Sequence, residues 1–426
     1  MIKIYSHYNK DTSWISNYDN RGFWNTVPST SWKTEQFVTK LRSITPRDNK
    51  KYEFIDYTPD ADNGYYLIFY GGSAPLLEHH GMAFLTSEIV EKINQGRLKL
   101  LIALVHETFD SGVSMREWFW LFCAIITRVG IKRPHSVVFF TSTQSGAPLH
   151  EDNRCDFVYY PWFEMDLRAT FTNHNIPCPI IDLSKKDRIF INLNLTLRQH
   201  RFLLVMYLYY RKLINYGYVS WRNPPTKCNW NEIVSGNGFE EWGLGYRGQL
   251  SSPSSAPFFY FVSTMKKIPN MVLDNYDFSK DGTLNATWIG ADEYYHRAWV
   301  DLVSETHPEL YGDTFLTEKT FKPMAHGMPF IFNATENHLK GIRNLGYQTF
   351  PELFDETYDT MPGSLNKIMK IGEELNLLCI DPNKQKILHS PEVQEKIKFN
   401  QDLFWNRDHH SAIANALTDA WLLGRA

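Results

Sequence analysis

Short, continuously apolar runs of strand length alternate with stretches of helical spacing over the first part of the chain. Strands of this kind are typical of a parallel sheet that is buried on both faces, with the helices forming the crossover connections. The chain is therefore predicted to be an α/β protein. The expected strands are Ile2–Ser6, Tyr65–Tyr70, Leu98–Val105, Ser136–Thr141 and Phe157–Tyr160, and the expected helices are Thr86–Gln95 and Met115–Val129.

The pattern restarts after a polar break at Asp182–Arg188. Because 426 residues are too many for one ordinary core, we expect two domains, at residues 1–183 and 184–400, and a C-terminal helix over 401–426 that could pack back on the first. The second domain should contain strands at Ile189–Leu193, Thr287–Gly290 and Pro329–Phe332, a short segment at Leu345–Phe350, and helices at Arg198–Tyr216, Glu293–Glu305, Ser364–Leu377 and Ser390–Phe399, before the tail helix Asp408–Gly424.

The charge and composition of the chain argue against several classes of function. The net charge of −3 argues against a globally basic nucleic-acid binder. Apolar runs long enough to span a membrane, about eighteen residues, are missing, and the N-terminus lacks a signal-peptide pattern. The five cysteines contain no Cys-x-x-Cys pair, so a disulfide framework or a zinc knuckle is not expected. These features predict a protein of the reducing cytoplasm without a membrane span.

The segment Asp313–Phe332 reads as a loop, a short helix, a glycine stop and a buried strand. Thr317 or Thr320 could cap the helix, and Gly327 fits its end. Glu318 and Lys319 then lie at the helix N-terminus, where free N–H groups attract phosphate. A lysine adds positive charge, and a glutamate can accept hydrogen bonds from ribose hydroxyls, which suits a nucleoside diphosphate. The alternative is a capped surface helix with an exposed Glu–Lys ion pair.

The pattern Thr-Glu-Lys-x-Phe, five residues, Gly-x-Pro, beginning at Thr317, resembles the nucleotide-sugar signature of α-1,3-fucosyltransferase-like glycosyltransferases and of related phage and viral proteins. The resemblance covers about twenty residues closely. It implies a GT-B fold, two Rossmann-like domains facing across a cleft, in which Glu318 holds the ribose and Lys319 the diphosphate. If the protein is phage-encoded, the location is the host cytoplasm. Pro323 departs from the pattern and could shift the helix start to Thr320.

Further donor-binding residues are expected where strands end. After the strand Ile189–Leu193, Asn194 leads into a helix whose first turns carry Arg198 and Arg201, and guanidinium groups there suit a diphosphate. In the resembling enzymes an arginine in an equivalent loop grips the phosphates. Tyr294, near the start of the helix predicted after Thr287–Gly290, could stack on the base. The alternatives are a solvated helix start for the arginines and plain packing for Tyr294.

The candidates for the catalytic base follow the strand Leu98–Val105. His106, Glu107 and Asp110 are titratable residues at the end of a buried strand, and an inverting transfer needs one base to take the acceptor proton. Glu107 ranks first because carboxylate bases fill this role in the resembling group. The alternative is a turn cluster that opens the next helix. Two other loops, Tyr70–Ser73 and Tyr160–Glu164, could line the acceptor side, or be a tight turn and interface packing.

Neither metal nor cofactor is expected. Asp60 and Asp62 match an Asp-x-Asp motif but lie in a Pro/Asn/Gly turn before a strand, and Lys319 with the arginines offers positive charge for the leaving diphosphate. The predicted activity is thus an inverting, metal-independent hexosyl-, deoxyhexosyl- or pentosyltransferase that uses a nucleotide sugar. Its acceptor is a saccharide or a hydroxymethylated base in phage DNA, the latter bound through Pro46–Tyr52 and Ser220–Lys227. The alternative is a non-catalytic nucleotide- or carbohydrate-binding protein of the same fold.

Overall fold

The computed structural model describes residues 1–6, 51–69, 85–104, 115–144, 152–194, 199–221, 271, 273, 292–306, 313–361 and 364–424. The contacts divide the chain into two compact units. Unit 1 comprises Met1–Ala169 together with Arg407–Ala426, and unit 2 comprises Thr170–Asn406. Each unit is built on a parallel sheet with helices, so the predicted α/β class is confirmed.

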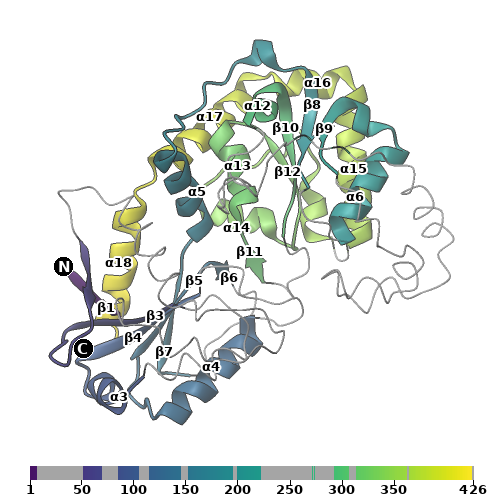
Figure 1. Ribbon diagram of the computed structural model, residues 1–426. Coiled ribbons are helices and arrows are strands. Elements are labelled where there is room, and N and C mark those ends of the chain that lie inside the picture. Colours follow the sequence, from purple (N-terminus) through teal and green to yellow (C-terminus); the bar gives the residue numbers. More distant parts are fainter. Residues whose placement is uncertain are drawn as a thin grey trace, which may run out of the picture. The chain divides into compact units, whose positions relative to one another are not determined.

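The sheet of unit 1 has the order β2-β1-β3-β4-β5-β7, and all of its pairings are parallel (Figure 1). Its central strands β4 and β5 are buried along their whole length, which explains why they are apolar apart from Lys99 and Thr141. The strand β2 was not predicted. The strands are β1 (Ile2–Ser6), β2 (Tyr52–Asp56), β3 (Gly64–Phe69), β4 (Leu98–Leu104), β5 (Val137–Thr141) and β7 (Cys155–Tyr159).

The C-terminal helix α18 (His409–Leu422) packs on the sheet of unit 1. The Tyr65 hydroxyl donates to the Leu417 carbonyl over 2.6 Å, and the Lys99 ammonium donates to the Ala420 carbonyl over 2.6 Å. At the start of α18, Asp408 caps the helix and the Tyr160 hydroxyl lies 2.5 Å from Nδ1 of His409. The other helices of this unit are α3 (Ser87–Asn94), α4 (Met115–Val129) and α5 (Trp162–Asn173), the last of which continues into unit 2.

The Tyr160–Glu164 segment is a buried helix start and not an open acceptor loop. Trp162 and Glu164 are fully buried at the beginning of α5. The Glu164 carboxylate accepts a hydrogen bond from Nε of Arg407 over 2.6 Å. This ion pair holds the chain where α18 begins, because a buried carboxylate needs a partner of opposite charge.

The sheet of unit 2 has the order β12-β10-β8-β9, again with parallel pairings. The chain places β9 on one side of β8 and then returns to place β10 and β12 on the other, so the direction of winding reverses between β8 and β10. The helices α13 and α17 cover one face of the sheet, and α6 and α15 cover the other (Figure 1). The strands are β8 (Arg188–Asn192), β9 (Gly217–Val219), β10 (Ala298–Ser304) and β12 (Phe330–Asn333).

The helices of unit 2 differ from the predicted ones in several places. The single helix predicted over Glu293–Glu305 is wrong: α12 ends at Arg297, and the buried strand β10 follows at once. The helix predicted over Arg198–Tyr216 ends at Tyr210, and the predicted strand Thr287–Gly290 lies outside the described residues. The α-helices are α6 (Gln199–Tyr210), α12 (Asp292–Arg297), α13 (Glu318–His326), α14 (His338–Asn344), α15 (Ser364–Ile380), α16 (Pro382–Leu388) and α17 (Pro391–Asn406).

Shorter elements complete the described part of the chain. Three 3-10 turns lie at Leu183–Lys185, Leu213–Tyr216 and Glu356–Thr360, and the side chains of Asp182 and Asp355 cap the first and the last of them. Two-residue strands lie at β6 (Thr143–Gln144) and β11 (Thr314–Phe315). Among the described residues, no helix combines the length and apolar character that crossing a membrane requires.

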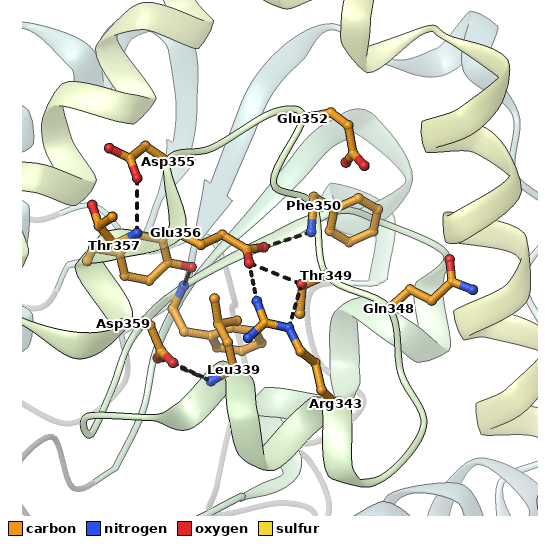
Figure 2. A network of polar contacts seen from close by, with 12 residues as sticks. Leu339, Arg343, Gln348, Thr349, Phe350, Glu352, Asp355, Glu356, Thr357 and Asp359 are labelled. Atoms are coloured by element: carbon orange, nitrogen blue, oxygen red, sulfur yellow. Dashed lines mark hydrogen bonds and ion pairs between the residues drawn. The ribbon is translucent and has the colours of Figure 1, made fainter.

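The segment Leu345–Phe350 is not a regular element but is held by a polar network (Figure 2). The Glu356 carboxylate accepts hydrogen bonds from the Phe350 N–H over 2.9 Å and from the Thr349 hydroxyl over 3.1 Å, and it pairs with Arg343. The Asp359 carboxylate accepts from the Leu339 N–H over 3.1 Å, at the start of α14. This network ties α14 to the segment that follows it and to the 3-10 turn Glu356–Thr360.

Candidate functional site

The helix α13 begins at Glu318. The Thr317 hydroxyl accepts a hydrogen bond from the Lys319 N–H over 3.3 Å, which makes Thr317 the N-cap and excludes the start at Thr320 considered above. Pro323 lies inside the helix, and the helix ends at Gly327, whose φ of 64° is in the left-handed region. The predicted order of short helix, glycine stop and buried strand is therefore confirmed, with Glu318 and Lys319 in the first turn of the helix.

Glu318 and Lys319 form an ion pair at the N-terminus of this helix. The Lys319 ammonium lies 2.5 Å from Oε1 of Glu318 and 3.2 Å from the Thr306 hydroxyl. The Glu318 side chain is 7% exposed and the Lys319 side chain 27%, so this is not the exposed ion pair of the alternative interpretation. Burial raises the pKa of Glu318, but the charges of Lys319 and Lys322 outweigh it and lower the pKa below its usual value. The carboxylate is thus ionised and able to accept hydroxyl donors.

A buried glutamate that the sequence did not point to, Glu305, holds this helix start in place. It directly follows β10 and is 1% exposed. Its carboxylate accepts hydrogen bonds from the Thr306 N–H over 3.0 Å, the Thr317 N–H over 3.3 Å, the Thr317 hydroxyl over 2.6 Å, and the Thr320 hydroxyl. The end of β10 and the start of α13 are therefore joined by one side chain. The misassigned helix over Glu293–Glu305 hid this position at a strand end.

The start of α6 meets the same point from the other side of the sheet. Nε2 of His200 lies 2.7 Å from the Glu305 carbonyl oxygen, and Nη2 of Arg201 donates to that oxygen over 3.2 Å. Arg201 is buried, so it links α6 to the end of β10 and offers little of its guanidinium to solvent. Its predicted partner Arg198 lies outside the described residues.

The strand ends at this edge also carry buried amides. Asn194 follows β8; its N–H donates to the Ser220 hydroxyl over 2.7 Å and its Nδ2 to Oδ1 of Asn192 over 2.6 Å. Three buried acceptor atoms near these ends meet no hydrogen-bond partner within the described ranges: Oδ1 of Asn194, Oδ1 of Asn333 and Oγ1 of Thr335. Buried polar atoms are normally paired, so acceptors of this kind suit a ligand that brings hydroxyl or N–H donors.

Topology explains why these residues meet. The carboxyl ends of β8 and β10 are neighbours, and the winding direction reverses between them. Ligands of open parallel sheets bind at the carboxyl edge at such a reversal, because the loops and helices on the two sides diverge there. Asn194, Arg201, Thr317, Glu318 and Lys319 all belong to this edge.

Tyr294 belongs to the opposite edge. It lies in α12, which precedes β10, and its ring centroid is 4.9 Å from that of Tyr218, near the start of β9. The structure thus brings Tyr294 together with the amino ends of the strands and not with Glu318.

Most of the other predicted site residues lie outside the described part of the chain. The three candidate bases, His106, Glu107 and Asp110, lie outside the described residues, as does Tyr70–Ser73. Asp60 lies in a turn in which the Ala61 N–H donates to the Thr58 carbonyl over 2.9 Å, so the turn interpretation of Asp-x-Asp is confirmed.

Comparison with protein-family models found no match, and neither did a search of curated proteins.

Proposed function

We propose that the carboxyl edge of unit 2 binds a nucleoside-diphosphate sugar, and that the protein transfers the sugar to a hydroxyl acceptor with inversion. The observation that carries the proposal is the position of Glu318 and Lys319, in the first turn of a helix that starts beside the winding reversal of the sheet. The resemblance quoted above implies nucleotide-sugar binding by the same two residues, which supports the proposal.

The charges of this edge support a ligand that is both anionic and rich in hydroxyls. The N-terminus of α13 and the partly exposed Lys319 ammonium favour a diphosphate. The ionised Glu318 carboxylate can accept from two ribose hydroxyls, and the buried oxygens of Asn194, Asn333 and Thr335, which have no partner among the described residues, are further acceptors. A simple phosphate would leave these acceptors unused.

The transfer step needs a base on the acceptor side and charge stabilisation on the donor side. In the proposed reaction, a carboxylate after β4, Glu107 first, takes the acceptor proton as the acceptor oxygen attacks the anomeric carbon. The bond from that carbon to the diphosphate breaks, and Lys319 with the α13 N-terminus stabilises the departing charge. A GT-B arrangement of the two units would bring acceptor and donor together and exclude water.

A nucleotide-sugar panel tests the proposal. The full-length protein is incubated with individual nucleotide sugars, with and without saccharide acceptors or hydroxymethylcytosine DNA, and the released nucleoside diphosphate is measured. We expect acceptor-dependent release with at least one donor, strongly reduced in Lys319→Ala and unchanged in Lys340→Ala, which removes an exposed lysine of α14. Tight nucleotide binding without release for any pair would point to a non-catalytic binding protein.

A further inference from the structure

A second group of chemically reactive side chains lies in unit 1, away from the residues discussed so far. Cys123 is in the middle of α4, Cys155 is the first residue of β7, and Asp152 lies between β6 and β7 in the sequence, three residues before Cys155. Their potential ligand atoms, two thiol sulfurs and a carboxylate oxygen, all lie within 4.8 Å of one another. We refer to these three residues as the Cys123 cluster.

We propose that the Cys123 cluster is a zinc site. Two thiolates and a carboxylate match the preference of Zn²⁺ for sulfur with one harder ligand, and a solvent molecule would complete the tetrahedron. Bonds of about 2.3 Å to sulfur and about 2.1 Å to oxygen place tetrahedral ligand atoms roughly 3.6–3.8 Å apart. The observed upper limit of 4.8 Å between the ligand atoms is about 1 Å longer than these separations.

The local backbone brings two of the ligands together. The Cys155 N–H donates to the Asp152 carbonyl over 3.1 Å, and the Arg154 N–H donates to the Asp152 carboxylate over 3.0 Å. This tight turn places Asp152 and Cys155, which are separated by two residues, on the same side, as the turn of a Cys-x-x-Cys motif does for its cysteines. The helix α4 supplies the third ligand, Cys123.

Arg154 supports the carboxylate from outside the cluster. Its Nε donates to Oδ1 and Oδ2 of Asp152 over 2.8 and 3.1 Å, while its Nη1 donates to the Ile131 carbonyl over 3.0 Å. Hydrogen-bonded carboxylates of this kind are held in one orientation, which is how residues around metal sites position the ligands.

The charge of the cluster also suits a divalent ion. A bound Zn²⁺ replaces the two thiol protons, so the total charge of the cluster with Arg154 stays the same as without the ion. That matters because Cys123 is buried, and an excess charge there would be costly. Asp152 and Cys155 are partly exposed, which gives the ion a path from solvent.

Cobalt spectroscopy on the full-length, reduced and metal-stripped protein tests the site. We expect Co²⁺ to produce thiolate-to-cobalt charge-transfer absorption with the intense d–d bands of tetrahedral coordination, at a stoichiometric endpoint, and Zn²⁺ to displace it. Cys123→Ser and Cys155→Ser should abolish this spectrum, and Arg154→Gln should weaken binding by roughly 10–100-fold. Cys178→Ser, which removes an exposed thiol of unit 2, should leave it intact.

Two results would overturn the assignment. One is the absence of thiolate–cobalt absorption in the reduced wild-type protein, a result that needs no variant and so does not depend on the variants folding. The other is a spectrum that persists in both cysteine variants, since the ion would then be bound elsewhere. A Cys123–Cys155 disulfide found by mass spectrometry in protein that binds no Co²⁺ after reduction would instead identify a redox pair.

Discussion

Replacing Glu305 should destabilise unit 2 more than any other single loss of a carboxylate at the candidate site. Glu305→Ala removes the acceptor of four hydrogen bonds in a position that is 1% exposed. The two threonine hydroxyls can rotate toward other acceptors, but the N–H groups of Thr306 and Thr317 cannot. Each buried donor without a partner costs about 1–3 kcal/mol, so the expected loss is roughly 2–6 kcal/mol. Glu305→Gln keeps one carbonyl oxygen and should cost less.

Urea denaturation of the full chain, followed by circular dichroism, measures this loss. The transition that includes unit 2 should move to lower urea in the order wild type, Glu305→Gln, Glu305→Ala. The control is Glu395→Ala, which removes an exposed carboxylate of α17 and should change stability by no more than about 0.5 kcal/mol. If Glu305→Ala unfolds at the same urea concentration as the control, the carboxylate does not hold the start of α13 and the network described above is incorrect.

Two further predictions concern stability. Burial, followed by the charge of Lys367, lowers the pKa of His338 to about 3. In the unfolded chain the histidine pKa is about 6.5. Between about pH 6.5 and pH 3, His338 therefore binds a proton in the unfolded chain but not in the folded protein. The free energy of unfolding should fall as the pH drops through this window, by up to about 1.4 kcal/mol per pH unit. His338→Gln should reduce that slope in urea titrations between about pH 6 and 4; an unchanged slope would mean that His338 is protonated in the fold. Tyr65→Phe leaves the buried Leu417 carbonyl without its hydroxyl donor and should cost about 1–3 kcal/mol. Tyr216→Phe, at an exposed tyrosine, is the matched control, and equal unfolding midpoints for the two variants would contradict a role of Tyr65 in holding α18.

Local patterns were sufficient to predict part of the fold. The strands β4 and β5 were predictable because nearly all of their residues are apolar, and α4 was predicted with its observed bounds because its apolar positions repeat at helical spacing. The strand β10 was missed because Tyr294 and Tyr295 of α12 continue into Trp299 and Val300 without a turn signal. This segment is a strand because it pairs with β8, where Ala298 is opposite Arg188, and because it is buried between β8 and β12. Neither contact can be recognised from the neighbouring residues in the sequence.

The candidate site likewise contains some residues that the sequence predicted and others that it did not. Thr317, Glu318 and Lys319 were predictable because cap, charge and helix start follow one another in the sequence. Glu305 and His200 were not, because they meet only when β8 and β10 become neighbours. The Cys123 cluster was likewise dismissed on spacing alone, since Cys123 and Asp152 come together only through the packing of α4 against the sheet.

The most direct test of the central claim is the calorimetric comparison of a nucleoside diphosphate with its parent nucleoside. Lys319→Ala removes a charge that faces phosphate in the proposed complex, so it should weaken diphosphate binding by about 2–3 kcal/mol and leave nucleoside binding nearly unchanged. Glu318→Ala should weaken both, because both ligands contain the ribose. Unchanged diphosphate affinity in Lys319→Ala, against the Lys340→Ala control, would contradict nucleotide binding at the start of α13.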